Sequence, residues 1–234
     1  MKSESVEDYL KAIYLIQERQ EGAWASTSSI AAHLGIADAS VTGMFKRFAA
    51  ADPPLAVYEK YGGVKLTQAG EKVALEVIRH HRLVECYLHE MLGYSWDEVH
   101  EEAERLEHVI SDEMEERLAQ ALGHPSVDPH GDPIPDRDGA YRQPDYQPLS
   151  AVPAGQMVQI RRVTGQQPDL LRYLSGLGLV LLAQVEVVSV APFTGPVTVR
   201  LLDENQTVQA LGREVAEQLL VMPVSAPSLQ RGDT

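Results

Sequence analysis

The sequence contains one cysteine, Cys86, among 234 residues. A single thiol cannot form an internal disulfide or a cysteine-based zinc cage, and this usage is typical of a reducing compartment. Long apolar runs are also missing, because the longest candidate, "YLSGLGLVLLAQV", is too short for a membrane span and is interrupted by glycine. The start, "MKSESVEDYL", shows no basic and apolar leader. We therefore expect a cytoplasmic protein without a membrane segment.

Basic residues are scarce, with 20 Lys and Arg against 34 Asp and Glu and a formal net charge of -14. The acidic excess is uneven. Residues 1–82 hold ten basic and ten acidic residues, residues 83–150 hold four and seventeen, and residues 151–234 hold six and seven. Because electrostatic fields are local and are screened over about 8 Å at physiological salt, the neutral first segment can still bind phosphate through basic residues gathered on one surface.

The chain reads as three units with one linker. Proline, glycine and aspartate concentrate in residues 123–155 without apolar periodicity, which predicts an extended connection. Before it, apolar residues at 3/4 spacing in "SVEDYLKAIYLIQER" and "AGEKVALEVIRHHRLVECYLHEML" predict helices. After it, four short β-branched runs predict the strands of a small barrel. The fold class is therefore mainly α with a small β part.

The stretch "STSSIAAHLGIADASVTGMFKRFAA" predicts two helices joined by a tight turn, the second carrying Val41, Met44, Phe45 and Phe48 inward. The other side of that helix holds small and hydroxyl residues near its start and basic residues after them, as a recognition helix needs. Next, "LAVYEKYGGVKLTQAG" predicts a hairpin with a basic turn, as in a wing. The candidate DNA-binding residues are Ser28, Ala37, Ala39, Ser40, Thr42, Gly43, Lys46, Arg47, Lys60 and Lys65. Helix-turn-helix geometry also occurs in domains that bind no DNA, so this alternative stays open from the pattern alone.

The acidic stretch "HEEAERLEHVISDEMEERL" predicts a metal-binding face if it forms one helix. At 100° per residue, His100, Glu104, Glu107 and His108 fall within about 100° of arc at the border of the buried stripe. Unpaired carboxylates there repel one another and resist desolvation, and a divalent cation would remove both penalties. The alternative is an ordinary solvated acidic face.

A second pattern indicates the same chemistry. In "HHRLVE", His81 and Glu85 are four residues apart on the preceding helix, and Asp8 lies one position off the apolar stripe of the first helix. An intrahelical pair is the ordinary alternative. Carboxylates and imidazoles without a thiol suit manganese or ferrous iron more than structural zinc. The other histidines, His80, His89, His124 and His130, are assigned to the surface or to loops, and Cys86 to the core.

Together, "EDYLKAIY", "HRLVE" and "HEEAERLEH" resemble the iron- and manganese-dependent repressors typified by the diphtheria toxin repressor and the manganese transport regulator. The resemblance covers nearly the whole chain. It implies four parts, namely a winged helix-turn-helix DNA-binding domain over 1–72, a helical dimerisation and metal-binding domain over 73–125, a proline-rich linker over 126–152 and an SH3-like domain over 153–226.

Carried over residue by residue, the resemblance implies two metal sites. The primary site comprises Asp8, Glu104, Glu107 and His108, and the ancillary site comprises His81, Glu85 and His100. The two barrel ligands of the iron-responsive members fall on Gln167 and Leu170, which leaves Gln167, or Asp169 two positions further on, as the candidate barrel ligand. Iron-responsive members have softer ligands at the positions of Asp8 and Glu104, so oxygen there favours Mn²⁺, with Fe²⁺ as the second candidate. Lys11 stands where two-domain manganese regulators have a further glutamate, so their paired-manganese site cannot be copied intact.

The implied function is metal-dependent transcriptional regulation, with repression as the expected direction. A homodimer would bind a palindromic double-stranded DNA operator of metal-homeostasis genes when Mn(II) or Fe(II) bridges the first helix to the acidic segment. The alternatives are a divalent-metal-dependent hydrolase and a metal-buffering protein. The sequence offers no oxyanion-hole loop, phosphate cradle or HExxH motif, so we expect a protein that is not an enzyme.

Overall fold

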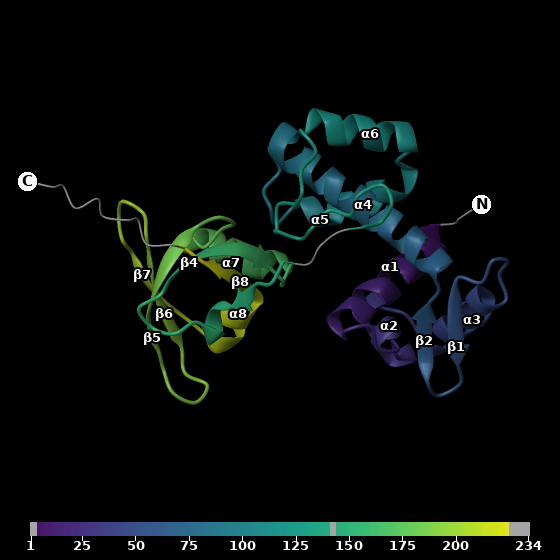
Figure 1. Ribbon diagram of the computed structural model, residues 1–234, viewed down its shortest axis with the longest axis horizontal. Coiled ribbons are helices and arrows are strands. Elements are labelled where there is room, and N and C mark those ends of the chain that lie inside the picture. The colour runs from purple at the N-terminus through teal and green to yellow at the C-terminus, as the bar shows by residue number, and fades with distance from the viewer. Residues whose placement is uncertain (1–3, 141–143, 225–234) are drawn as a thin grey trace, which may run out of the picture. The chain divides into compact units, whose positions relative to one another are not determined.

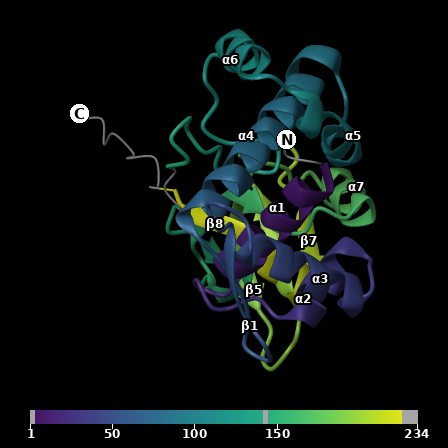
Figure 2. The same cartoon turned by 90° about the vertical axis from the view of Figure 1, so that its right-hand side faces the viewer.

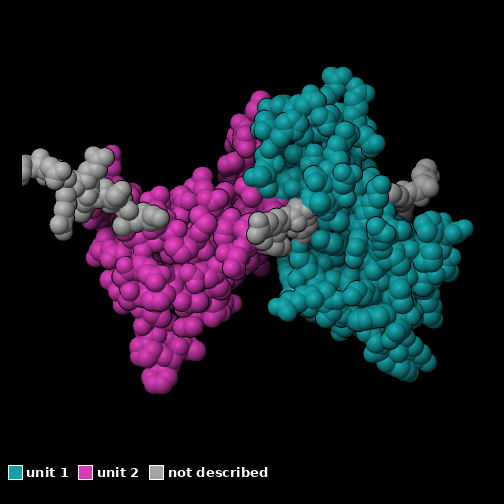
Figure 3. All heavy atoms as spheres, viewed as in Figure 1, with its two compact units in different colours: residues 1–84, 103–126, 134–141 teal, residues 85–102, 127–133, 142–234 magenta. Residues whose placement is uncertain are grey.

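A computed structural model describes residues 4–140 and 144–224. Residues 1–3 of the predicted first domain, 141–143 of the predicted linker and 225–226 of the predicted last domain lie outside the described residues. Two compact units are present (Figure 3). Their segments are Met1–Val84, Ala103–Ser126 and Ile134–Tyr141 in unit 1, and Glu85–Glu102, Val127–Pro133 and Arg142–Thr234 in unit 2.

Unit 1 begins with a three-helix bundle beside a hairpin (Figures 1 and 2). Its elements are α1 (Glu4–Arg19), α2 (Thr27–Leu34), α3 (Asp38–Ala49), β1 (Ala56–Glu59) and β2 (Gly63–Leu66). The hydroxyl of Ser26 caps α2 by accepting from Ser29 N–H at 3.0 Å, and Gly35 ends it in the left-handed conformation. Val41, Phe45 and Phe48 of α3 are buried, as the periodicity predicts. The helix-turn-helix is therefore set by ordinary capping and by one apolar stripe.

The hairpin pairs β1 and β2 antiparallel, with Ala56 opposite Leu66 and Glu59 opposite Gly63. Ala25 adds an isolated bridge to Val64. Gly63 has φ +103°, and a Cβ there would lie 2.4 Å from the carbonyl oxygen of Ala25. Only glycine fits this close approach, so the "YGG" turn is fixed by sterics.

The helical part contains α4 (Gln68–Leu92), α5 (Val99–Leu106), a 3₁₀ turn η1 (Glu107–Val109) and α6 (Asp112–Ala121). The prediction of one helix through the acidic stretch is wrong. Ile110 is extended, and the Ser111 hydroxyl caps a new helix by accepting from Met114 N–H. A good N-cap at Ser111 competes with helix continuation, and the chain turns there.

Unit 2 is built on a six-stranded antiparallel sheet with the order β3-β8-β4-β5-β6-β7. The strands are β3 (Gln147–Pro148), β4 (Met157–Val163), β5 (Gln184–Val190), β6 (Val197–Leu201), β7 (Val208–Leu211) and β8 (Leu219–Pro223); η2 (Leu149–Ala151), α7 (Pro168–Gly176) and α8 (Arg213–Gln218) accompany them. Trp96, which precedes α5, is buried in the same core as the strands. The predicted small β part is thus present, and its core also contains Trp96 from the helical region.

Residues 127–133 form a compact loop within unit 2, bridged from Val127 to Pro133. This part of the predicted linker is neither extended nor solvated, because Asp128, His130 and Asp132 are buried. His130, which was assigned to the surface or to loops, lies in a loop but is buried. No helix among residues 4–140 and 144–224 is long and apolar enough to span a membrane.

Candidate metal centres and nucleic-acid surface

Three of the four predicted primary ligands converge in unit 1. Ligand atoms of Asp8 on α1 and of Glu107 and His108 on η1 all lie within 4.8 Å of one another. His108 Nε2 is 2.8 Å from Asp8 Oδ1 and 3.5 Å from Glu107 Oε1. These three side chains form the primary centre, which has two carboxylates, one imidazole and no sulfur.

Glu107 is the buried anchor of the primary centre, and its side chain has no solvent exposure. Its carbonyl oxygen faces His80 Nδ1 at 3.1 Å, while His80 Nε2 lies 3.1 Å from Glu115 Oε2. Arg79 Nε donates to the other oxygen of Glu115 at 2.7 Å. His80 was assigned to the surface or a loop, but it is buried and holds the backbone of a candidate ligand. That assignment is therefore wrong.

His108 is oriented from its other ring nitrogen, since Nδ1 lies 2.8 Å from Glu7 Oε2. A carboxylate on the second nitrogen is the usual companion of a metal-binding histidine. Burial acts to lower the pKa of His108, but the hydrogen bond with Glu7 and the charges of Glu107 and Asp8 outweigh it and raise the pKa. Burial raises the pKa of Asp8, against the opposing attraction of His108. The positive charge of protonated His108 thus offsets part of the negative charge that a metal cation would otherwise offset.

Lys11 supplies a second internal cation beside the primary centre. Its buried ammonium donates to Glu104 Oε1 at 2.6 Å and to Glu107 Oε2 at 2.7 Å. Glu104, the fourth predicted ligand, lies outside the group of converging ligand atoms but is tied to it through Lys11. Sequence reasoning noted Lys11 as a departure from relatives and missed this ion-pair role.

The predicted ancillary residues are divided between the two units. His81 belongs to unit 1, where its Nδ1 is 2.5 Å from Glu107 Oε2 and 3.1 Å from the Lys11 ammonium. Glu85 and His100 belong to unit 2, where Glu85 Oε1 lies 3.3 Å from His100 Nδ1. Within unit 1, His81 therefore contacts a primary candidate ligand.

A second converging group lies entirely in unit 2. Ligand atoms of Glu85, Asp128 and His130 fall within 4.8 Å of one another, and all three residues are buried. His130 Nε2 is 2.7 Å from the carbonyl oxygen of Trp96 and must donate to it, which leaves Nδ1 as the lone-pair nitrogen of the neutral ring. Nδ1 faces Glu85 Oε2 at 3.6 Å and makes no hydrogen bond within the described part of the chain. We name these three residues the second centre.

The second centre needs a positive charge between two electron-rich atoms. Burial acts to lower the pKa of His130, but the neighbouring Glu85 and Asp128 carboxylates outweigh it and raise the pKa to about 9. Either a proton or a metal ion satisfies this arrangement. Sequence reasoning found Glu85 and missed the other two, although acidic residues alternate with the histidine in "DPHGD".

Neither predicted barrel ligand is buried with the group in unit 2. Gln167 is exposed at the start of α7, and Asp169 is exposed and paired with Arg172 at 2.6 Å. Gln166, which precedes Gln167, instead donates to Asp132 Oδ2 at 2.8 Å.

The candidate DNA-binding residues form an exposed surface on unit 1. Ser28, Ala37, Ala39, Ser40, Gly43, Lys46, Arg47, Lys60 and Lys65 are exposed, and Thr42 is half-buried with its hydroxyl donating to Asp38 O at 3.1 Å. Small residues at the start of α3 permit close approach to base edges, while the basic residues and the hairpin turn suit phosphates.

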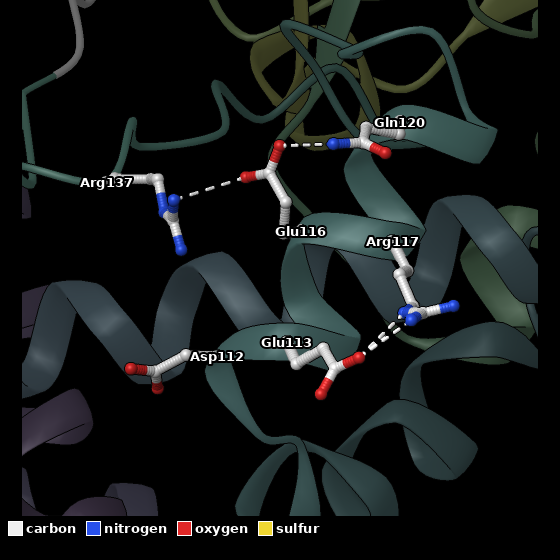
Figure 4. A pocket seen from close by; sticks show the side chains of 6 residues that line it. All are labelled: Asp112, Glu113, Glu116, Arg117, Gln120 and Arg137. Atoms are coloured by element: carbon white, nitrogen blue, oxygen red, sulfur yellow. Dashed lines mark hydrogen bonds and ion pairs between the residues drawn. The ribbon is translucent and has the colours of Figure 1, made fainter.

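The exposed acidic residues of α6, within the "DEMEERL" stretch, behave as a solvated face. In the surface pocket on α6, Glu113 pairs with Arg117 at 2.7 Å, and Glu116 pairs with Gln120 at 2.8 Å and Arg137 at 3.4 Å (Figure 4). Because these carboxylates already have partners and face solvent, the pocket is a poor metal site compared with the two centres.

Three protein-family models match most of the chain. The model of the iron-dependent repressor N-terminal DNA-binding domain matches residues 1–64, that of the metal-binding and dimerisation domain matches 67–136, and that of the FeoA domain matches 147–223. The iron-dependent repressor IdeR of Mycobacterium tuberculosis is 32% identical over 196 residues, covering 79% of this chain and 84% of the relative. This chain belongs to the iron-dependent repressor family.

Two further similarities place it within that family. The diphtheria toxin repressor of Corynebacterium diphtheriae is 36% identical over 135 residues, covering 58% of each chain. A solved manganese-dependent transcriptional repressor in complex with manganese has a TM-score of 0.83 and 34% identity, covering 94% of this chain and all of that chain. The chain is a metal-dependent transcriptional repressor with a DNA-binding domain, and its family does not consist of enzymes. The hydrolase alternative is therefore excluded.

Proposed function

We propose that this repressor is activated by Mn(II), with Fe(II) as the second candidate, and that its homodimer then binds a palindromic operator of metal-homeostasis genes. The observation that carries the proposal is the convergence of Asp8, Glu107 and His108. Two carboxylates and one imidazole without sulfur form a ligand set suited to Mn(II) and Fe(II). The similarity to a manganese-bound repressor supports the same metal.

The primary centre would link the DNA-binding part to the acidic segment within unit 1. Asp8 lies on α1, whereas Glu107 and His108 lie on η1. Asp8, Glu107 and His108 would hold the cation, and its positive charge would be shared by both elements, with Glu104 and His81 beside it. Before binding, His108 must lose the proton that its neighbours stabilise, so metal binding and proton release are coupled. A cation that bound only the conformation in which α1 and η1 are held together would supply the free energy of the switch.

We assign the ancillary role to the second centre, Glu85, Asp128 and His130. Once His130 has lost its extra proton, the neutral ring donates through Nε2 and can offer Nδ1 to a cation, as metal-binding histidines commonly do. His100 lies against Glu85 and orients it. This assignment retains Glu85 and His100 from the predicted set and adds two residues of the 127–133 loop.

The dimer would place two α3 helices about 34 Å apart, or a multiple of it, on successive major grooves. Most apolar residues of α4 are already buried within the chain. Val109 and Met114, with relative exposures of 75% and 48%, are the apolar residues of unit 1 that we assign to the dimer contact. Both follow Glu107 and His108 of the primary centre in sequence.

A mobility shift on a palindromic promoter fragment tests the proposal, with Mn(II), anaerobic Fe(II) or chelator in the buffer. We expect a shift with metal and none with chelator. A shift that chelator leaves unchanged contradicts the metal switch, and no shift with any fragment contradicts operator binding. A dimer that persists in both Val109→Glu and Met114→Glu, by light scattering, contradicts the assigned contact.

A further inference from the structure

We propose that strand β4 positions the ligands of the second centre by holding the 127–133 loop, with Arg162 as the positioning residue. The inference rests on the proposed second centre and extends it to a residue that touches no ligand atom. It gives the C-terminal sheet a defined part in metal binding even though Gln167 and Asp169 do not reach the site.

The loop is shaped first by its own aspartate. Asp128 Oδ1 accepts hydrogen bonds from His130 N–H at 2.8 Å and from Asp132 N–H at 3.0 Å. Asp128 N–H donates to the carbonyl oxygen of Asp132 at 3.0 Å. Asp128 therefore fixes the loop and contributes to the second centre at the same time. A change in the loop conformation therefore also moves this ligand.

Strand β4 then holds this loop from outside. Val163 N–H donates to the carbonyl oxygen of His130 at 2.8 Å, and Arg162 forms an ion pair with Asp132. Gln166 donates to the second oxygen of Asp132 at 2.8 Å. Two contacts meet at the buried Asp132 and one at the backbone of His130.

The loop backbone also lies directly against the strand. Gly131 has φ +87°, and a Cβ there would lie 2.1 Å from the carbonyl oxygen of Arg161. A contact this short leaves no room for any other residue, so the packing of the loop on β4 is specific.

The histidine ring is held on its other side by Trp96. The two rings stack with centroids 6.1 Å apart at 21°, and Trp96 O accepts from His130 Nε2. Trp96 Nε1 donates to Ser175 Oγ on α7 at 2.7 Å, and the Trp96 ring belongs to the C-terminal core. His130 is thus fixed by the sheet through Val163 and by the sheet's helix through Trp96.

Residues that orient metal ligands typically change metal affinity 10- to 100-fold when they are removed. We expect Arg162→Met to weaken Mn(II) binding at the second centre by about that factor, because Asp132 is released and the loop loosens. Arg162→Lys keeps the charge and should restore part of the affinity. The matched control is Arg200→Met, since Arg200 on β6 pairs with Glu186 on β5 and not with the loop.

The experiment uses the full chain with Trp24→Phe, so that Trp96 is the remaining tryptophan. Mn(II) is titrated while Trp96 fluorescence is followed, because paramagnetic Mn(II) bound beside the stacked His130 should quench it. Asp128→Asn should abolish the response, and Arg162→Met should have no further effect in that background. A separate readout without metal is amide exchange at Val163, which should speed up in Arg162→Met.

Each outcome decides a different claim. An unchanged Mn(II) midpoint in Arg162→Met, or an equal loss in Arg200→Met, overturns the positioning role. No Trp96 response in the parent chain overturns the second centre and this inference with it. None of these results bears on the primary centre, whose test is a mobility shift of the His108→Ala variant with and without metal.

Discussion

The ammonium of Lys11 lies 2.7 Å from Oε2 of Glu107, whose side chain is fully buried. A buried carboxylate without a counter-charge is strongly unfavourable, so this contact neutralises Glu107 when no metal is bound. The same ammonium reaches Glu104 at 2.6 Å. Lys11 and an incoming divalent cation therefore act on the same carboxylates.

Replacing Lys11 should lower stability and strengthen metal binding together. Breaking one side of a buried pair costs about 3 kcal/mol, which lowers Tm by roughly 6–12 °C in a chain of this size. Without the competing charge, Lys11→Met should bind Mn(II) about tenfold more tightly. Thermal unfolding with chelator and with Mn(II) measures both effects. Lys60→Met, at an exposed position, is the control, and weaker Mn(II) binding in Lys11→Met would refute the competition.

Metal activation should depend unequally on His108, a member of the primary centre, and on His81, a partner of Glu107. His108→Ala removes a ligand atom 2.8 Å from Asp8, so we expect loss of metal-activated DNA binding, and the same for Glu104→Ala. His81→Ala, which removes a partner of Glu107, should raise the Mn(II) requirement by about tenfold. His89→Ala, at an exposed position, should behave as the parent chain. Equal and small effects at Glu104, His81 and His108 would argue against this centre.

The basic surface of unit 1 should bind the phosphates of DNA. Lys46→Ala and Lys65→Ala remove exposed cations from α3 and from the hairpin, so each should weaken binding to all fragments and reduce the salt slope by about 1. Fluorescence anisotropy at several salt concentrations measures this slope. Arg117→Ala, exposed and paired with Glu113 on α6, should leave the slope unchanged. If it lowers the slope equally, the assignment of this surface fails.

The single cysteine should be unreactive in the folded chain. Burial, together with the nearby carboxylates of Asp128, Glu90 and Glu85, raises the pKa of Cys86. Because the folded thiol stays protonated where the unfolded thiol ionises, near pH 8.5, its contribution to stability is present below that pH and declines above it. A thiol reagent at pH 8 should label Cys86 only after denaturant is added. Rapid labelling of the native chain would show that this core opens.

Periodicity and capping were sufficient to predict the winged helix-turn-helix, because Val41, Phe45 and Phe48 follow one stripe and Gly63 marks the wing turn. The primary residues were predictable in kind, since acidic residues and histidines at the edge of an apolar stripe need a cation. Their geometry was not, because the N-cap at Ser111 ended the helix and η1 placed Glu107 and His108 on the same side.

The second centre could not be predicted by periodicity, because Asp128 and His130 lie in a loop without a repeating pattern. Their burial depends on Val163, Arg162 and Trp96, which are distant in sequence and meet only in the folded unit. A composition rich in proline, glycine and aspartate is shared by solvated linkers and by tight, buried turns. Tertiary contacts decide between the two.

The placement of Trp96 limits how this chain can be shortened. Its ring has a relative exposure of 7% within the core that the C-terminal strands complete. A chain ending at residue 126 would leave that indole uncovered, together with the last turns of α4 that belong to the same unit. Such a fragment should self-associate through this surface, so shortened chains used for crystallisation or binding assays need a polar replacement at Trp96.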